Sequence, residues 1–325
     1  MLWQRGQAVI GRGKPKRKRT MAVSAQRVAV IGLGSMGFGM AVSLLRAGFV
    51  VTGCDVSADS VARFKATGGQ GAATPADAVR DAEIIVSVVV NAAQTDAILF
   101  GKDGALEAMP PGAVFVSAAT MDPEIAKRLA ARVEATGRLY LDAPISGGAQ
   151  RAAQGELTIL ASGSAAAFAK ARPALDAMAA KLYELGDAPG QGSAFKMINQ
   201  LLAGVHIAAA SEAISFAAKQ GLDIRKVYEV ITASAGNSWM FENRVPHVLE
   251  GDYTPRSAVD IFVKDLGIVQ DMARNAKFPV PMSAAALQMF LMASAAGMGR
   301  DDDIAVAKMY AQVTGAPLPG APKRD

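Results

Sequence analysis

The feature that most constrains this chain is a glycine-rich turn between a short apolar strand and a helix. RVAVIG (27–32) is rich in β-branched residues, and it leads through GLGSMG into the helical segment MGFGMAVSLLRAG. Gly32, Gly34 and Gly37 follow the G-x-G-x-x-G spacing. In that pattern the first glycine permits a tight turn, the second lets the backbone approach a pyrophosphate, and the third allows close helix packing. Glycines alone indicate only a turn, so the next strand matters.

That strand supplies the acidic residue that a dinucleotide site needs. VVTGCD (50–55) ends on Asp55, 23 residues after Gly32, close to the ~20 expected for a carboxylate that binds the ribose hydroxyls. A carboxylate there would repel the 2′-phosphate of NADP, and the next arginine comes only at Arg63, so NAD is favoured over NADP. The predicted cofactor contacts in this region are Gly32, Leu33, Gly34, Ser35, Met36, Gly37 and Asp55.

Apolar strands and helices continue to alternate as far as residue 186. The predicted strands cover 84–89, 114–119, 139–144, 158–163 and 181–186. This alternation indicates an α/β fold with a largely parallel, doubly wound sheet of the Rossmann type. Ligands bind such sheets beyond the carboxyl ends of the strands. Val90, Asn91 and Thr120 follow two of these ends and are therefore further candidates to contact the cofactor.

The segment that follows residue 141 reads DAPISGG. Ser146 offers a hydroxyl, and Gly147 and Gly148 offer bare backbone N–H groups, which together can hold a carboxylate. Read alone, the same three residues also suit an ordinary loop.

Residues 190–221 predict one long helix. Between Ser193 and Ala218 there is no proline, and Lys196 and Glu212 carry the only full charges. A helix that is apolar on every face belongs in a core. At ~1.5 Å per residue it would be about 45 Å long, which suits a helix that joins two lobes.

Lys196 is the unusual residue of this helix. It lies in the first turn, where a cation opposes the helix dipole, and its neighbours are apolar. Both effects disfavour the ammonium form and lower the pKa of a lysine. Lys196 is therefore the first candidate for a functional residue, and the alternative is a lysine that extends its amine to water.

The remainder of the chain predicts a second, all-helical domain. Asp223 is placed to cap a helix that ends near 236, residues 236–244 suggest a polar and aromatic loop, and further helices are expected over 259–276, 281–299 and 301–315. No cluster of Cys and His occurs, so no metal site is expected, and His206 is expected to pack in the core. The predicted domains are a disordered basic extension (1–26), a Rossmann domain (27–190), a helical domain (191–315) and a flexible tail (316–325).

The positive net charge of the chain comes from its N-terminus. The whole chain has a formal charge of +5, and residues 1–20 supply seven Lys and Arg and no acid, so the rest has a charge of −2. A nucleic-acid surface on the fold is therefore not expected. The segment KPKRKR is either a basic arm or an extension ahead of the start at Met21. No apolar run reaches the ~18 residues of a membrane span, and the single Cys54 fits a reducing cytoplasm.

Four motifs together resemble a known family. GLGSMGFGM, DAPISGG, GQGSAFKMINQ and FVKDL occur in this order and at spacings similar to those of the 3-hydroxyacid (β-hydroxyacid) dehydrogenases, from Arg27 to about Gly315. The runs HIAAASEAISFAAKQG, AGNSWMFENR and DYTPRSAVDIFVKDLG look most like the branch that acts on L-threonate.

The resemblance implies a role for each matching residue. Lys196 corresponds to a general acid–base that acts on the substrate oxygen, residues 146–148 to a cradle for the substrate carboxylate, and Thr120 and Lys264 to positions near the nicotinamide. Many relatives carry an Asn four residues after the lysine. This chain has Gln200 there and Asn199 beside it, so either amide is a candidate to contact the substrate.

The implied activity is NAD-dependent oxidation of a small hydroxy acid, L-threonate at C2, in a homodimer or homotetramer. Reduction of 2-hydroxy-3-oxopropionate and oxidation of 3-hydroxyisobutyrate are alternatives within the family. A non-enzymatic dehydrogenase fold with a nucleic-acid-binding arm is the alternative from another class, although this chain retains Lys196 and the carboxylate loop. The residues expected to help set substrate length are Asn237, Ser238 and Trp239, of which the tryptophan could instead be a packing anchor.

Overall fold

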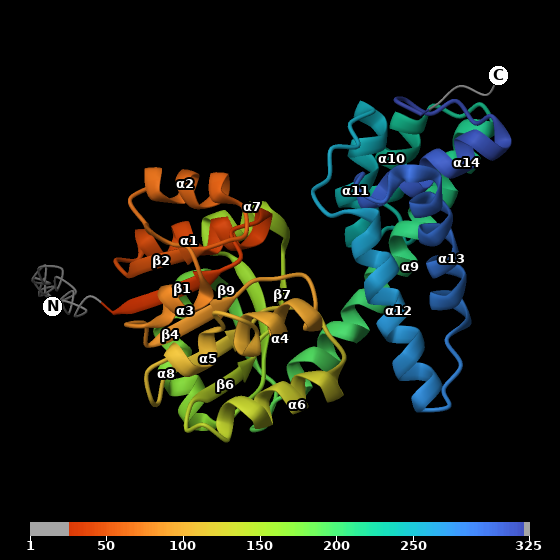
Figure 1. Ribbon diagram of the computed structural model, residues 1–325. Coiled ribbons are helices and arrows are strands. Elements are labelled where there is room, and N and C mark those ends of the chain that lie inside the picture. The colour runs from red at the N-terminus through yellow and green to blue at the C-terminus, as the bar shows by residue number, and fades with distance from the viewer. Residues whose placement is uncertain (1–25, 322–325) are drawn as a thin grey trace, which may run out of the picture.

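The computed structural model describes residues 26–321, which form two lobes joined by one long helix (Figure 1). The strands of this part of the chain all lie in the N-terminal lobe, and the C-terminal lobe is built of helices. Helix α9 (Gln191–Lys219) leaves the first lobe and runs through the second, as the long apolar segment predicted. The basic segment at residues 1–20 lies outside the described residues.

The larger sheet has six parallel strands in the order β3-β2-β1-β4-β5-β6. These are β1 (Arg27–Ile31), β2 (Val50–Cys54), β3 (Gln70–Ala72), β4 (Ile84–Ser87), β5 (Val114–Ser117) and β6 (Leu139–Asp142). The order reverses between β1 and β4, which is the switch point where such sheets bind ligands. The doubly wound Rossmann sheet is therefore confirmed, although the short, largely exposed strand β3 was not predicted.

Helices connect these strands and cover the sheet. They are α1 (Ser35–Arg46), α2 (Ala58–Ala66), α3 (Pro75–Val79), α4 (Ala92–Phe100), α5 (Ala105–Ala108) and α6 (Pro123–Glu134). Side chains along β1 alternate between two apolar clusters, Val28 and Val30 in one and Ala29 and Ile31 in the other. A strand with helices on both faces requires this arrangement, and it buries the sheet so that ligands can approach only its edges.

The chain then turns back and forms a separate three-stranded sheet. Its strands are β7 (Ile145–Ser146), β8 (Leu157–Ala161) and β9 (Ala179–Glu184), connected by α7 (Gly148–Gln154) and α8 (Ala165–Met178). The expectation that 158–163 and 181–186 extend the parallel sheet was wrong. β7 reverses direction and pairs antiparallel with β8, and Asp142 meets Ser162 only through an isolated antiparallel bridge. Apolar periodicity marks a strand but does not specify its neighbour.

The C-terminal lobe packs five helices around α9. They are α10 (Ile224–Thr232), α11 (Trp239–Glu250), α12 (Val259–Asn275), α13 (Pro281–Ala293) and α14 (Val306–Thr314). Ile207 and Ile214 of α9 lie in one apolar cluster with Phe262 of α12 and Phe290 of α13, whose rings stack. The predicted cap of α10 is confirmed, because the Asp223 carboxylate accepts a hydrogen bond from the backbone N–H of Arg225.

Three expectations for this lobe were wrong. Residues 239–244 begin α11 rather than a loop, because the Ser238 hydroxyl caps the helix and Phe241 is buried against α9. The tail predicted from 316 is packed as far as it is described, since Ala316 and Leu318 are buried in the helical core. His206 is only half-buried on α9 instead of lying in the core.

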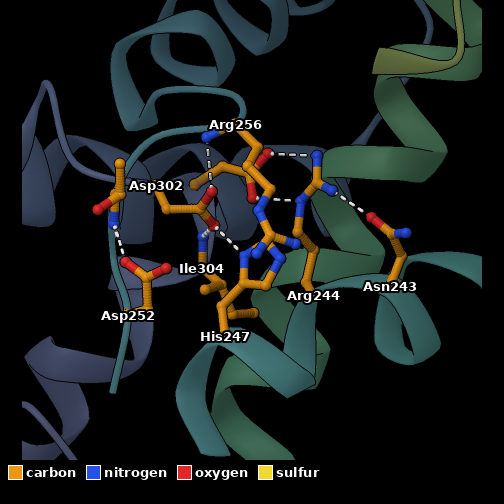
Figure 2. A network of polar contacts seen from close by, with 9 residues as sticks. Asn243, Arg244, His247, Asp252, Arg256, Asp302 and Ile304 are labelled. Carbon is orange, nitrogen blue, oxygen red and sulfur yellow. Dashed lines mark hydrogen bonds and ion pairs between the residues drawn. The ribbon is translucent and has the colours of Figure 1, made fainter. Parts of the chain in front are cut away.

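A buried network of charged side chains ties α11 to the segment before α14 (Figure 2). Arg244 Nε donates to Asp303 Oδ1 at 2.7 Å, and His247 Nδ1 lies 3.1 Å from Asp302 Oδ1. Asp302 also accepts a hydrogen bond from the backbone N–H of Arg256 at 3.0 Å. Burial raises the pKa of Asp303 to about 6, and Arg244 opposes that rise. Because a buried charge without a partner is costly, the Arg244–Asp303 ion pair helps fix how α11 meets the segment before α14.

Candidate active site

The glycine turn after β1 has the geometry that a dinucleotide requires. Gly32 has φ +96°, and a Cβ on it would lie 2.2 Å from the carbonyl oxygen of Val88. A Cβ on Gly37 would lie 1.8 Å from the carbonyl oxygen of Gly32, so α1 reaches the turn only because residue 37 has no side chain. Around Gly34, in contrast, no atom lies within 4 Å of the Cβ position, and the start of α1 has no side-chain cap. The open space and uncapped N–H groups fit a pyrophosphate.

Asp55 lies against this turn at the end of β2. Its Oδ2 accepts a hydrogen bond from the backbone N–H of Leu33 at 2.6 Å, and its Oδ1 accepts one from Ser57 N–H at 2.8 Å. The Arg63 guanidinium lies over the Phe38 ring, 5.0 Å from its centroid. The acid that follows β2 is therefore held beside the glycines, as the sequence predicted. Arg63, the next arginine along the chain that could bind a 2′-phosphate, instead stacks on the Phe38 ring.

Residues after β4 and β5 lie along the same edge of the sheet, since all these strands are parallel. Val90 is half-exposed, and its N–H donates to Gln94 Oε1 at 2.8 Å. The Asn91 side chain caps α4 by accepting a hydrogen bond from Gln94 N–H at 2.9 Å. The carbonyl oxygen of Thr120 accepts a hydrogen bond at 3.2 Å from Nζ of Lys264, on α12. The second lobe therefore contacts the sheet edge through a residue that the sequence had singled out.

The loop after β6 presents bare backbone. Gly147 and Gly148 have φ +138° and +79°, conformations that favour glycine, and a Cβ on Gly148 would meet no atom within 4 Å. Ser146 ends β7 directly before them. Helix α7, which these glycines begin, is held against α1 because the Ser43 hydroxyl donates to the carbonyl oxygen of Ala152 at 2.9 Å. The loop is thus tied to the helix that follows the glycine turn.

Lys196 is buried in the second turn of α9, with only 7% of the residue exposed. Among the described residues its amine has no hydrogen-bond or ion-pair partner within contact distance. Burial lowers the pKa of Lys196 to about 8, the negative charge of Asp265 opposes this shift, and the positive charge of Lys264 adds to it. The lowered pKa agrees with the apolar surroundings that the sequence predicted, although α9 begins at Gln191 and so places Lys196 in the second turn rather than the first.

Asp265 organises the side chains around this lysine, and the sequence analysis did not single it out. It is buried, pairs with Lys264 through Oδ1, and accepts a hydrogen bond from Gln200 Nε2 at 2.6 Å through Oδ2. Asn199 Nδ2 donates to Gln200 Oε1 at 2.9 Å. Gln200 thus faces the buried acid, while Asn199 is more exposed. The only signal for Asp265 was its place beside Lys264 in the run FVKDL.

The three residues expected to set substrate length are held locally in α11 and the turn before it. Asn237 Nδ2 reaches the carbonyl oxygen of Thr232, Ser238 caps the helix, and Trp239 is half-exposed. In the described part of the chain no hydrogen bond joins them to Lys196. Their role therefore stays a prediction.

Comparison with known proteins agrees with this geometry. The chain matches the family model described as the NAD binding domain of 6-phosphogluconate dehydrogenase over residues 27–186, and the one described as NAD-binding of NADP-dependent 3-hydroxyisobutyrate dehydrogenase over residues 190–310. An L-threonate dehydrogenase of Cupriavidus necator is 55% identical over 91% of this chain and 99% of its own length. The mitochondrial 3-hydroxyisobutyrate dehydrogenase of Rattus norvegicus is 32% identical over 87% of this chain and 86% of its own.

The fold is shared as well. The crystal structure of a 3-hydroxyisobutyrate dehydrogenase from Salmonella typhimurium, 50% identical in sequence, superposes with a TM-score of 0.84 over 87% of this chain and 99% of that one. Together with the glycine turn, the acid after β2 and the buried lysine, these matches establish that the chain belongs to the 3-hydroxyacid dehydrogenase family and is an NAD-dependent hydroxyacid dehydrogenase.

Proposed function

We propose that the protein oxidises L-threonate at C2 to the 2-oxo acid, with Lys196 as the general base and NAD as the hydride acceptor. The observation that carries the mechanism is the buried Lys196 amine, whose pKa is lowered to about 8 at the place where the second lobe meets the sheet edge. The choice of substrate rests on five relatives named L-threonate dehydrogenase, which are 47–55% identical to this chain.

Each group of residues has one task in this reaction. The glycine turn and Asp55 would hold the cofactor, which when bound would supply the acceptor for the hydride that leaves C2. Ser146 and the N–H groups of Gly147 and Gly148 orient the substrate by its carboxylate. The Lys196 amine accepts the proton of the C2 hydroxyl, and in the reverse direction the ammonium form returns it to the carbonyl oxygen.

The pKa of Lys196 is the property that makes this step feasible. A base is most effective when its pKa is near the working pH, and burial brings the lysine to about 8. The charge of Asp265 keeps the pKa of Lys196 from falling further, so Lys196 can also serve as the general acid in the reverse direction. Asn199 and Gln200 both stay candidates to contact the substrate: Gln200 is held by Asp265 at 2.6 Å, and Asn199, which is more exposed, donates to Gln200 at 2.9 Å.

NAD is proposed over NADP because of Asp55. Its carboxylate lies against the glycine turn, where it would accept hydrogen bonds from the ribose hydroxyls and repel a 2′-phosphate. kcat/KM measured with each cofactor tests this directly. A higher value with NADP would show that Arg63, rather than Asp55, determines the choice.

The substrate is tested by following NADH formation with L-threonate, D-glycerate and 3-hydroxyisobutyrate under the same conditions. We expect the highest kcat/KM with L-threonate. Preference for 3-hydroxyisobutyrate is the second candidate, which the name of the Salmonella typhimurium structure favours. Turnover of that acid alone would keep the mechanism and replace the substrate, whereas no turnover of any hydroxy acid would reject the proposed function.

We further propose that the protein is a cytoplasmic homodimer or homotetramer, assembled through its helical lobes. Phe195, Ile198, Leu202 and Phe216 lie on one face of α9 and are each at least half-exposed in the single chain. Met282 is a further exposed apolar residue, on α13. Surfaces of this kind mark contact sites. Light scattering should give a multiple of the 33.6 kDa chain mass, and Phe216→Lys should lower it; a wild-type monomer at micromolar concentration would contradict the assembly.

A further inference from the structure

Asp142, the last residue of β6, binds the first turn of α9, the helix that joins the two lobes. It is almost completely buried. Its Oδ2 accepts hydrogen bonds from the backbone N–H of Gly190 at 3.0 Å and of Ser193 at 2.8 Å, and its Oδ1 accepts one from the Ser193 hydroxyl at 2.7 Å. The first N–H groups of a helix have no partner within the helix, so this carboxylate acts as a helix cap supplied from about 50 residues away along the sequence.

The neighbouring strand completes the contact. The Ser162 hydroxyl after β8 accepts a hydrogen bond from Gly192 N–H at 2.9 Å and lies 3.5 Å from Asp142 Oδ2. A Cβ on Gly192 would lie 2.3 Å from the carbonyl oxygen of Leu160 and 2.8 Å from that of Asp142. The start of α9 therefore packs closely against the ends of β6 and β8. Hydrogen bonds from both sheets hold it there.

This contact sets two parts of the active site relative to each other. Asp142 immediately precedes the loop that carries Ser146, Gly147 and Gly148, and the helix turn that it holds leads directly into Lys196. The group that would orient the substrate carboxylate and the group that would take the hydroxyl proton thus share one anchor.

We propose that Asp142 is a positioning residue that fixes the Lys196 amine at its buried location relative to the carboxylate-binding loop. The predicted effect on catalysis rests on the proposed function. The predicted effect on the position of Lys196 rests on the hydrogen bonds alone. Each contact uses the carboxylate as an acceptor, which is the pattern that an ionised side chain satisfies. Burial raises the pKa of Asp142, and the hydrogen bonds from Ser193, Gly190 and Ser162 oppose that rise.

The test compares two changes at this anchor. Asp142→Asn keeps the shape but replaces one acceptor by a donor, and Ser193→Ala removes only the hydroxyl contact. If the helix start loosens, water reaches Lys196 and its pKa rises toward the ordinary value. We expect kcat for hydroxy-acid oxidation to fall by at least ~10-fold in Asp142→Asn, and the pH inflection of kcat to move upward by roughly one unit. Ser193→Ala should change kcat and its pH inflection in the same directions but to a smaller extent. The affinity for NAD should stay unchanged in both variants.

Matched controls remove a helix cap of the same kind elsewhere. Ser164→Ala removes the cap of α8, and Asp223→Ala removes that of α10. Both should lower thermal stability slightly and leave the pH inflection in place.

A second readout does not depend on turnover. The rate of reductive methylation of Lys196, followed by mass spectrometry between pH 6 and 11, reports the pKa of its amine in the folded protein, which burial lowers to about 8. An upward shift in Asp142→Asn supports the proposal even if the enzyme accepts none of the acids offered. An unchanged labelling curve with loss of thermal stability alone would overturn it and make Asp142 a purely structural cap. Should Asp142→Asn not fold, Ser193→Ala decides by the same curve.

Discussion

Replacing Asp265 by Asn is expected to move the pH dependence of the enzyme toward acid. Asp265 is buried beside Lys196, and its charge opposes the pKa shift caused by burial, whereas the charge of Lys264 adds to it. Removing the carboxylate while keeping its shape should therefore lower the pKa of Lys196 further. Replacing Lys264 by Met should raise it. The two variants are thus predicted to shift the pKa of Lys196 in opposite directions.

The magnitude follows from the pKa of about 8 for Lys196. At pH 7 about one lysine in ten is then the free amine, compared with about one in 3,000 at an ordinary lysine pKa. Loss of one close opposite charge shifts a pKa by ~1 unit or more, so in Asp265→Asn the free amine should reach about half at pH 7. Oxidation needs the free amine, so the oxidation rate rises with pH through the pKa of Lys196. Reduction needs the ammonium form, so the reduction rate falls over the same pH range.

The assay is kcat/KM for hydroxy-acid oxidation between pH 5.5 and 10, with saturating NAD, because this parameter reports the ionisation of the enzyme before substrate binds. The wild type should reach half of its maximal kcat/KM at about pH 8, the pKa of Lys196. Asp271→Asn is the matched control, since Asp271 lies on the same helix but is exposed and pairs with Arg274. Shifts of Asp265→Asn and Lys264→Met in the same direction, or no shift in either, would refute the assignment of Lys196 as the base.

Three further predictions concern single side chains. Lys196→Ala should abolish turnover and leave NAD binding largely intact, as measured by fluorescence quenching; a variant that keeps most of its kcat would remove the lysine from the mechanism. Gly34→Val should weaken NAD binding by at least ~10-fold with little loss of stability, because its side chain would enter the space for the pyrophosphate, whereas Gly37→Val should prevent folding because of the 1.8 Å overlap. Arg244→Ala should lower the free energy of unfolding by about 3–5 kcal/mol, since it leaves a fully buried aspartate unpaired; urea denaturation should show a loss below ~1 kcal/mol for Arg172→Ala, whose ion pairs are half-exposed.

Local features of the sequence determined much of this protein. The three glycines, the acid after β2 and the long apolar helix act over short distances along the chain, through backbone conformation and one-dimensional periodicity. That is why the glycine turn, α9 and the cap of α10 were predicted. The lowered pKa of Lys196 followed from its place in the first turns of an apolar helix.

Long-range partners were decided only by the tertiary structure. Strands β8 and β9 have the pattern of any buried strand, but a turn-back at β7 gave them a sheet of their own. Nothing near Asp142 in the sequence indicates that it caps a helix about 50 residues later, and only the family resemblance, not a local pattern, placed Lys264 near Thr120. Buried polar groups take whichever partner the packed chain brings to them, so a hydrogen bond between distant segments is decided by how the elements meet and not by the residues beside it.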